Sequence, residues 1–281
     1  DKSVRILNRI VSWNKDSITY EPDQRHVEIV VKALGLQNSS KGVSTPGVKS
    51  AKGEELSKAL SKEEQFHYRS LVMRLNYIAQ DRPDIQFAVK ELARCMSAPT
   101  SNDWEGLKRL GRYLVTHGRV VLTFHRQNAS TFLDSRVDTD FAGCLKTRRS
   151  TNGGALMHGS HCLNTWSSTQ AVIALSSGEA EFYGAVKGAS TGLGMKALYR
   201  DIGYQLPLRL WTDSSAAVGI CSRQGLGKLR HLECTSLWLQ QRIRHGELEV
   251  RKIAGEFNPA DLYTKHLESK AKIEQLVSLF G

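Results

Sequence analysis

The spacing of apolar residues along the chain changes near residue 120. From residue 61 to 117 apolar side chains recur with a helical period, whereas later they fall in short alternating segments typical of strands. The expected strands of the later part are 120–124, 131–139, 154–158, 162–167, 208–212 and 248–253, and the expected helices are 177–202, 214–221, 230–245 and a piece from Pro259. Strands that then alternate with helices predict an α/β fold for the second half of the chain.

The first 60 residues combine three patterns. Residues 3–20 alternate in the manner of two strands joined by a turn at 14–16, and a helical period then runs from Asp23 to Gly35, a residue typical of helix ends. Residues 37–55 are rich in Ser, Gly, Lys and Pro, which indicates a linker or an exposed loop. We therefore expect a hairpin, a helix and a linker before the helical segment.

The helical segment begins at a capping box, because Ser61 is followed three residues later by Glu64. A second helix is expected near Pro83 and a third from about residue 102. Four basic side chains are expected to point outward from the third helix or to lie just beyond its end: Lys108, Arg109, Arg112 and Arg119. That arrangement fits either a solvated helix face or contact with phosphate groups, and the sequence leaves both open.

The chain is basic in both halves. It has 39 Lys and Arg against 28 Asp and Glu, a net charge of +11; residues 1–130 hold 21 basic and 14 acidic residues, and residues 131–281 hold 18 and 14. Basic surfaces favour polyanions such as nucleic acid, but charge alone does not distinguish a specific partner from none.

Composition excludes several other classes of protein. A hydrophobic share of 40% with 24% charged residues is typical of a globular chain. No apolar run approaches the roughly 18 residues of a membrane span, and the first residues lack a signal-peptide core, so we expect an intracellular protein with no membrane partner. The five cysteines contain no CxxC pair, which argues against a disulfide framework or a zinc site. Because the chain begins at Asp1 and not at Met, we expect it to be part of a longer protein.

Four acidic residues stand where expected strands or helices begin or end. Asp138 lies on the strand of VDTDFAG, Glu181 lies in the first turns of the helix that starts in ALSSGEAEF, Asp213 ends the strand LRLWTD, and Asp261 begins the last helical piece in EFNPAD. Strand ends and helix starts can converge at one edge of a sheet. We therefore expect these carboxylates to form a cluster.

Clustered carboxylates repel one another unless divalent cations neutralise them. Hard oxygen ligands without accompanying His or Cys favour Mg²⁺, or Mn²⁺, over zinc. Two such ions about 4 Å apart can activate water and stabilise a leaving oxygen at a phosphodiester. The sequence therefore predicts a two-ion site, although each acid taken singly could have a smaller role.

Those smaller roles remain open for several acids. Asp213 could only cap the short helix that follows it, and Asp261 could only favour a helix dipole. Glu179 and Asp140 are rival candidates for the cluster. We expect Glu181 to face inward because it shares a helix face with a run of small residues, and we expect Glu179 to cap the helix.

Six motifs in register resemble one known family. The runs VDTDFAG, TRRSTNGG, WSSTQAVIALSSGEAEFYGA, LWTDSSAAV, LRHLE and FNPADLYTKHL occur in the order found in the ribonuclease H domain of copia-type retrotransposon Pol polyproteins. The upstream run from YRSLVMRLNYIAQ to GLKRLGRYL is similar to the segment that follows the reverse-transcriptase palm in that family. The resemblance covers nearly the whole chain.

The resemblance implies a ribonuclease H-like, mixed five-stranded sheet with flanking helices, preceded by a mainly helical thumb or connection segment. Its expected boundaries are 1–60 for the end of the palm and a linker, 61–125 for the helical segment and 126–281 for the ribonuclease H domain. The implied activity is metal-dependent cleavage of the RNA strand of RNA/DNA hybrids during reverse transcription. Its implied catalytic residues and metal ligands are Asp138, Glu181, Asp213 and Asp261.

The resemblance also implies partners and a place in the cell. The partners would be an RNA/DNA hybrid and the remainder of the Pol polyprotein, in a cytoplasmic virus-like particle or in the nucleus. Phe141 stands where the family usually has Trp, and the loop before Asp261 lacks a His that assists product release. No Asp-Asp pair occurs in the chain, so it carries no polymerase active site.

Contacts with the hybrid can be assigned only as candidates. Polar groups near the cluster could read the 2′-hydroxyl of RNA, and basic side chains could contact phosphates. These candidates are Ser176, Ser177 and Ser214 for the sugar, and Arg148, Arg149, Lys228 and Arg230 for phosphate. Two rival hypotheses are a non-catalytic nucleic-acid-binding remnant of a decayed or domesticated element and a structural spacer within the polyprotein.

Overall fold

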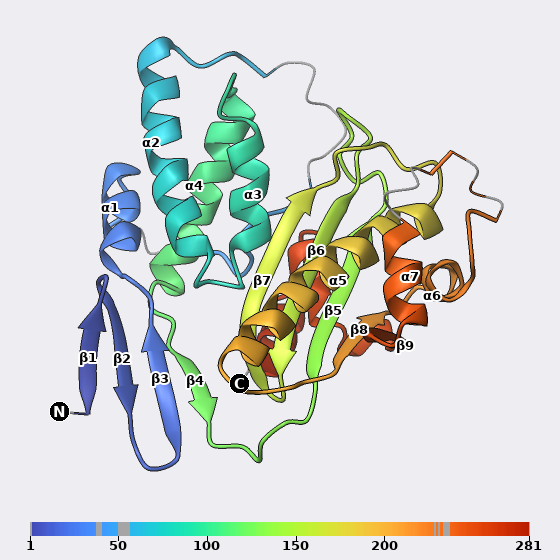
Figure 1. Ribbon diagram of the computed structural model, residues 1–281. Helices are drawn as coiled ribbons and strands as arrows, with labels where there is room; N and C mark the ends of the chain where they lie inside the picture. Colours follow the sequence, from blue (N-terminus) through green and yellow to red (C-terminus); the bar gives the residue numbers. More distant parts are fainter. Residues whose placement is uncertain are drawn as a thin grey trace. The chain divides into compact units, whose positions relative to one another are not determined.

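The computed structural model divides into two compact units, which Figure 1 colours along the chain. The first unit comprises residues 1–126 and 266–279, and the second comprises residues 127–265 with Phe280. The structure describes residues 2–37, 41–49, 57–227, 229, 231–232 and 237–280. The expected linker at 37–55 therefore lies partly outside the described residues.

A four-stranded antiparallel sheet begins the first unit. Its strands, in spatial order, are β1 (Ser3–Ile6), β2 (Arg9–Trp13), β3 (Ser17–Glu21) and β4 (Leu122–His125). The expectation of a single strand before the turn at 14–16 is wrong, because that segment forms two strands, β1 and β2. Leu7 and Asn8 adopt φ values of 49° and 63° and turn the chain between them. Positive φ at both central residues is the conformation of the tight hairpin turn.

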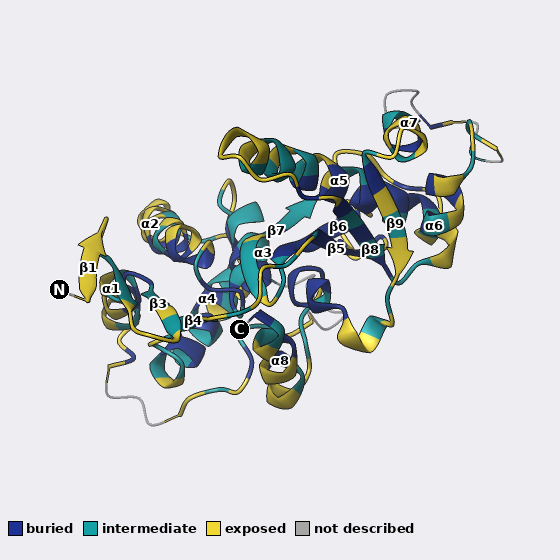
Figure 2. Cartoon of the chain, turned by 60° about the horizontal axis from the view of Figure 1, so that its bottom comes forward, coloured by how far each residue is buried: buried dark blue, intermediate teal, exposed yellow. Residues whose placement is uncertain are grey.

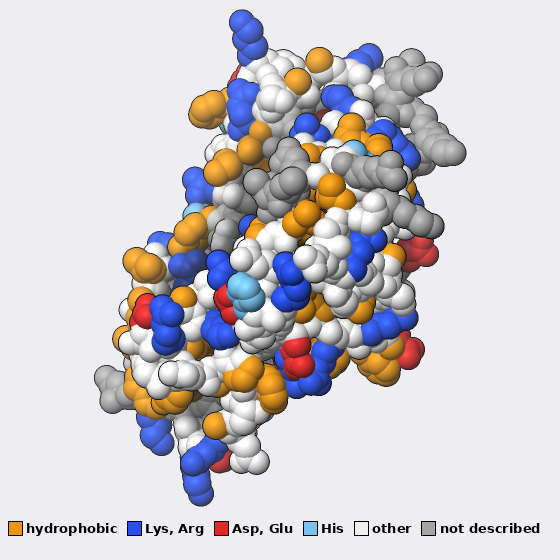
Figure 3. Space-filling model, turned by 45° about the vertical axis from the view of Figure 1, so that its right-hand side comes forward, with side chains coloured by type: hydrophobic (Ala, Val, Ile, Leu, Met, Phe, Trp, Pro, Cys, Tyr) orange, Lys and Arg blue, Asp and Glu red, His pale blue; other side chains and the backbone are white. Residues whose placement is uncertain are grey.

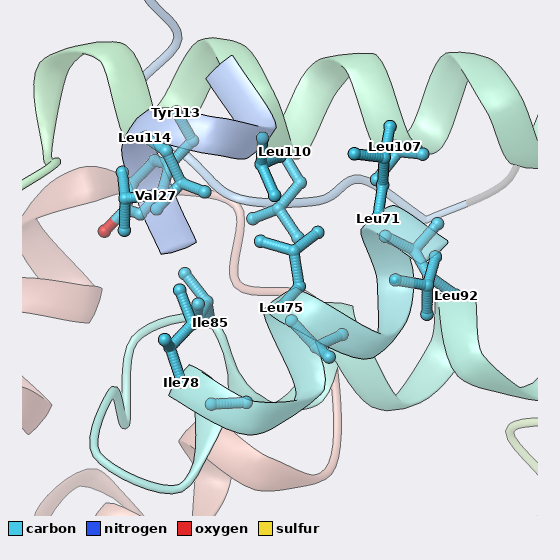
Figure 4. Close-up of a cluster of buried hydrophobic side chains, with 14 of the residues drawn as sticks. Val27, Leu71, Leu75, Ile78, Ile85, Leu92, Leu107, Leu110, Tyr113 and Leu114 are labelled. Carbon is cyan, nitrogen blue, oxygen red and sulfur yellow. The ribbon is translucent and has the colours of Figure 1, made fainter. Parts of the chain in front are cut away.

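The first unit also contains five described α-helices. They are α1 (Arg25–Ala33), α2 (Lys62–Ala79), α3 (Gln86–Arg94), α4 (Ser101–Thr116) and α8 (Lys270–Val277). The expected capping box is present, since the Ser61 side chain accepts from the backbone of Glu64 and the Glu64 carboxylate accepts from Ser61. Leucine, isoleucine and valine side chains of α1, α2, α3 and α4 meet in one buried core, which Figure 4 shows in close-up.

A buried ion pair joins the turn after α2 to the end of α4. The Arg82 and Asp84 side chains are only 2% and 9% exposed, and their closest charged atoms are 2.7 Å apart. Arg82 also donates to the backbone oxygens of His117 and Gly118, and the Tyr113 hydroxyl donates to Asp84 at 3.0 Å. Nearly every polar atom of the pair therefore has a partner, which is the condition for burying charge without a large penalty.

The second unit is built on a mixed five-stranded sheet, as expected. The spatial order is β7 (His161–Thr169), β6 (Thr151–His158), β5 (Leu133–Asp140), β8 (Leu208–Thr212) and β9 (Leu248–Lys252). β5 pairs in parallel with β8 and β8 with β9, whereas β5, β6 and β7 pair antiparallel. Figure 2 shows that the central strands β5, β6 and β8 are the most deeply buried.

Helices cover one face of this sheet. They are α5 (Ser177–Asp201), α6 (Ser215–Ser222) and α7 (Trp238–Arg244). Short 3₁₀ turns follow along the chain at η3 (Gly255–Phe257) and η4 (Pro259–Tyr263), and η5 (Ser278–Phe280) comes after α8. α5 approaches the sheet closely, because a Cβ added at Gly188 would overlap Cγ1 of Val137. A helix that has no side chain there can lie against the strands at backbone distance.

The structure gives the extent and the partners of three expected elements more exactly. The strand expected at 120–124 is β4, and it pairs with β3 of the first unit. The helical piece from Pro259 is the short 3₁₀ turn η4, and the longer helix α8 belongs to the first unit. Of the helix expected at 230–245, the structure describes α7 over Trp238–Arg244, and residues 230 and 233–236 lie outside the described residues. Among the helices that the structure describes, none is long and apolar enough to cross a membrane.

Candidate metal site

Three of the expected acids meet at one edge of the five-stranded sheet. Oxygen atoms of Asp138, Glu181 and Asp213 lie within 4.8 Å of one another. Asp138 lies on β5 and Asp213 directly follows β8, and continuing the parallel register of these strands places the two residues level. Over the described ranges, this is the one group of three or more His, Cys, Asp or Glu side chains whose ligand atoms lie this close together.

The start of α5 determines which glutamate enters the cluster. The Ser176 side chain caps the helix by accepting from the Glu179 backbone N–H, and the Glu179 carboxylate accepts from the Leu175 N–H at 3.0 Å. Glu179 also lies 2.8 Å from Nε2 of His231. Glu181, two residues further on, points to another side of the helix and lies beside Asp138. Glu179 thus has the capping position expected of it, and His231 is a partner that the sequence did not reveal.

The cluster holds more negative charge than its surroundings neutralise. Burial raises the pKa of Asp138 to about 7, and repulsion from Asp261 and Asp213 adds to this effect. Burial also raises the pKa of Glu181 to about 9, with further repulsion from Asp138 and Asp213. The pKa of Asp213 is raised by burial and by Asp261. Each carboxylate therefore disfavours the ionisation of the others.

One carboxylate oxygen in the cluster has no hydrogen-bond donor. Oε2 of Glu181 is buried and finds no partner among the residues that the structure describes. A buried, unpartnered acceptor among ionisable acids is costly unless a cation satisfies it. The donor set is oxygen alone, which suits a hard divalent cation such as Mg²⁺ or Mn²⁺ better than zinc. The residues present therefore fit the metal that the sequence predicts.

Asp261 lies next to the three clustered acids but is already paired. It is part of η4, and its Oδ1 lies 2.6 Å from Nζ of Lys265. Nζ of Lys265 is also 3.9 Å from Oδ2 of Asp138. The sequence motifs do not single out Lys265, although its position four residues after Asp261 is the spacing at which side chains of opposite charge meet on one helical turn.

Hydrogen bonds attach η4 to the strand that carries Asp138. The Asn258 side chain donates to the backbone oxygen of Val137 at 2.8 Å and accepts from the Ala260 N–H. The Thr264 hydroxyl donates to the Asp138 carboxylate. Gly153 on β6 leaves the space for this approach, since a Cβ there would lie 2.6 Å from Cγ2 of Thr264. Asp261 is therefore held beside the sheet by contacts that do not involve its own charge.

A buried amide stabilises the approach to α5. The Gln170 side chain, only 4% exposed, donates to Oδ1 of Asn152 at 2.6 Å and to the backbone oxygen of Ala180 at 2.8 Å. Ala180 immediately precedes Glu181, so this bond fixes the backbone that carries the clustered glutamate. Gln170 belongs to the quoted motif WSSTQAVIALSSGEAEFYGA, but its role could not be read from the sequence.

The candidate contacts with nucleic acid are dispersed. On α4, Lys108 pairs with Glu105 at 3.0 Å, Arg109 donates to the Thr45 hydroxyl, and Arg112 is partly exposed. The candidates around the second unit's cluster are exposed at Arg148, Arg149, Ser176 and Ser177, and partly exposed at Ser214, which caps α6. Lys228 and Arg230 lie outside the described residues.

Basic side chains do not gather in one patch on the face that Figure 3 shows. Blue Lys and Arg side chains are spread over that face, with acidic side chains between them. The positive charge of the chain is therefore distributed there, and charge clustering alone does not mark a binding surface.

Relatives that match most of the chain include Pol polyproteins of plant transposons. The chain is 29% identical over 254 residues to the retrovirus-related Pol polyprotein from transposon RE2 of Arabidopsis thaliana, which covers 88% of the chain and 17% of the relative. The Pol polyprotein from transposon RE1 of the same plant is 28% identical over 249 residues, 86% of the chain and 17% of the relative. That from transposon TNT 1-94 of Nicotiana tabacum is 27% identical over 266 residues, 92% of the chain and 20% of the relative.

The chain spans about a fifth or less of the length of these relatives. No family model matches it. The alignments nevertheless span 86% to 92% of the chain. The chain is therefore a homologue of the retrovirus-related Pol polyproteins of plant transposons, which confirms the resemblance that its motifs carry.

Proposed function

We propose that the chain is the part of a copia-type Pol polyprotein that contains the end of the reverse transcriptase and the ribonuclease H domain, and that it cleaves the RNA strand of RNA/DNA hybrids. The observation that carries this proposal is the meeting of Asp138, Glu181 and Asp213 within 4.8 Å, with a buried Glu181 oxygen that has no donor among the described residues. The mixed five-stranded sheet and the Pol homologues support a ribonuclease H-like fold around that cluster.

Each residue of the proposed site has a separable task. Asp138, Glu181, Asp213 and Asp261 would hold two Mg²⁺, or Mn²⁺, at the sheet edge. The chemistry that such a pair supplies when bound is activation of a water molecule and stabilisation of the departing 3′ oxygen. The Thr264 hydroxyl orients the Asp138 carboxylate, and Gln170 fixes the backbone that carries Glu181. Products would carry 5′-phosphate and 3′-hydroxyl ends.

Recognition of the hybrid is proposed to involve both parts of the chain. The exposed serines at the start of α5 and the partly exposed Ser214 at the start of α6 are candidates for reading the 2′-hydroxyl, and the arginines before β6 are candidates for phosphate contact. In this proposal residues 126–281 are the nuclease, residues 61–125 are a helical thumb or connection that binds duplex, and residues 1–60 continue a palm. The remaining Pol polyprotein would supply the polymerase, in a cytoplasmic particle or in the nucleus.

Cleavage of a labelled hybrid tests the proposal. The purified chain should cut only the RNA strand when Mg²⁺ is present and should stop when EDTA is added. Asp213→Asn should abolish the cut, whereas Asp201→Asn, which alters an exposed acid at the far end of α5, should leave it unchanged. Cleavage that survives Asp213→Asn would rule out the metal site, and hybrid binding without any cleavage would favour a non-catalytic remnant. Absence of both would favour a spacer.

A further inference from the structure

Lys265 lies between two acids of the cluster. Its Nζ is 2.6 Å from Oδ1 of Asp261 and 3.9 Å from Oδ2 of Asp138. The neighbouring Thr264 hydroxyl bonds to the same Asp138 oxygen. The lysine side chain is 47% exposed, so its ammonium reaches the cluster from the solvent side and has room to leave.

Lys265 is the principal cation at this site. Across the part of the chain that the structure describes, no other Lys, Arg or His forms an ion pair with any of the four acids. Lys252 acts on Asp213 only at longer range, and its Nζ donates to the Ser215 hydroxyl. One ammonium therefore compensates part of the charge of four carboxylates, and it does so at the Asp138–Asp261 side of the cluster.

We propose that Lys265 is a built-in counter-ion that takes the place of the second divalent cation between Asp138 and Asp261, and that the second ion binds by displacing it. This inference rests on the proposed function. The Lys265 ammonium lies 2.6 Å from Oδ1 of Asp261. A Mg²⁺ ion bound to the same oxygen would lie about 2.1 Å from it, in the space that the ammonium fills. The two cations compete for one position.

The arrangement makes the two halves of the cluster unequal. The side formed by Glu181 and Asp213 has no ion-pair partner among described residues, whereas the side formed by Asp261 is already neutralised. A first ion therefore binds without moving the lysine, and a second ion must release it. Lys265 would hold Asp261 in position before the second ion arrives and would weaken that ion's affinity.

Calorimetric titration with Mg²⁺ alone tests the competition on the full chain. Lys265→Met keeps an unbranched side chain out to the ε position but removes the charged ammonium, and it should tighten the weaker of two Mg²⁺ affinities by about tenfold, or 1.4 kcal/mol. Lys270→Met is the matched control, because Lys270 forms an exposed i,i+4 pair with Glu274 in another unit. Lys252→Met controls for long-range charge. Both should change the affinity by less than about twofold.

Chemical labelling gives a second readout that does not depend on substitution. Reductive methylation of the unmodified chain should modify Lys265 slowly in EDTA, because its ammonium is paired, and faster at saturating Mg²⁺. The labelling of Lys270 should not change with Mg²⁺. A Lys265 rate that is unchanged or lower in Mg²⁺ would overturn the displacement.

The outcomes separate the inference from the proposed function. Equal Mg²⁺ affinity in the unmodified chain and Lys265→Met, with hybrid cleavage retained, would overturn the inference alone. An equal gain in Lys252→Met would also overturn it, because the effect would then be general electrostatics. Absence of Mg²⁺ binding by every variant would overturn the proposed function and the inference together.

Discussion

Asp84 in the first unit and Asp138 in the second are both acids with little exposure, yet their surroundings shift their pKa values in opposite directions. Burial alone would raise the pKa of Asp84, but the charge and hydrogen bonds of Arg82, together with the Tyr113 hydroxyl, hold it below its usual value. Burial raises the pKa of Asp138 to about 7, and the attraction of Lys265 only partly opposes this. The first acid is satisfied by the fold and the second is not.

The difference indicates what each acid is for. A buried carboxylate with a fully paired arginine joins segments of the chain, and removal of either partner leaves a charge stranded. A buried carboxylate surrounded by other carboxylates destabilises the metal-free fold, which is typical of functional sites. The two units therefore offer an internal comparison, because similar substitutions should affect stability in one unit and activity in the other.

The largest expected effect is on cleavage. Asp138→Asn should lower the rate of hybrid cleavage by at least about a hundredfold, because it removes a ligand charge at the reacting centre. The same substitution should not lower the melting temperature in EDTA, since it removes repulsion within the cluster. Asp140→Asn, at the rival acid two residues later, is the control and should retain cleavage. Hybrid cleavage by Asp138→Asn would contradict the view that the buried acid of the second unit serves activity while that of the first unit serves stability.

The second effect is on stability. Asp84→Asn should destabilise the first unit by about 3 kcal/mol, because it leaves the Arg82 guanidinium buried without a counter-charge. Hydrogen exchange of the α2 and α4 amides measures this loss within that unit. Glu105→Gln, which breaks the exposed pair with Lys108, should cost less than about 0.5 kcal/mol. A small loss in Asp84→Asn would show that the buried pair contributes little.

The third effect is the pH dependence of stability without metal. The pKa of Asp138 rises from 3.8 to about 7 on folding, so its contribution is fully present below pH 3.8 and is lost as the pH rises to about 7. The lowered pKa of Asp84 has the opposite sign, with a contribution present above pH 3.8 and lost in acid.

Hydrogen exchange in EDTA between pH 4 and 7 should separate these contributions by unit. Protection of α5 should fall with rising pH once intrinsic exchange rates are corrected, and protection of α2 should not. Saturating Mg²⁺ should remove the decline in α5, because bound cations favour the ionised carboxylates. A decline in α5 that persists with Mg²⁺ would contradict the metal assignment.

The smallest effect compares two helix caps. Ser61→Ala and Ser176→Ala should each cost about 1 kcal/mol, since each side chain accepts from the N3 backbone of its helix. Only Ser176→Ala should also slow hybrid cleavage, because α5 carries Glu181. Chemical denaturation and the cleavage assay together measure both effects. Equal cleavage by the two variants would mean that the cap of α5 does not position the glutamate.

Local patterns account for much of the architecture. Period-two alternation predicted the strands of the five-stranded sheet, and Ser61 with Glu64 predicted the start of α2. The convergence of Asp138 and Asp213 followed from the placement of both at ends of apolar strands. The run of small residues on the helix face of Glu181 predicted that this side chain points toward the sheet. Small residues allow one face of α5 to pack closely against the strands, and Glu181 lies on that face.

Other features depend on contacts that no local pattern contains. β4 pairs with β3 across about a hundred residues of chain, so its alternation could not show which sheet it joins. The turn at Leu7 and Asn8 lacks the glycine that usually marks one. Arg82 and Asp84 look like an exposed charged turn in the sequence, and their burial follows only from the packing of α2 against α4. The role of Lys265 could not be predicted from the sequence, because a lysine close to acidic residues in the sequence is common on protein surfaces.

The glycines of α5 have a consequence for diverged copies of this gene. A Cβ at Gly184 or Gly188 would overlap Thr139 or Val137 on β5, and one at Gly192 would lie 2.7 Å from Leu208 on β8. A copy that keeps all four acids but carries alanine at these positions must shift either α5, which carries Glu181, or the strand side chains beneath it. Inheritance of the glycines is therefore a second criterion for an intact site, beside inheritance of the acids.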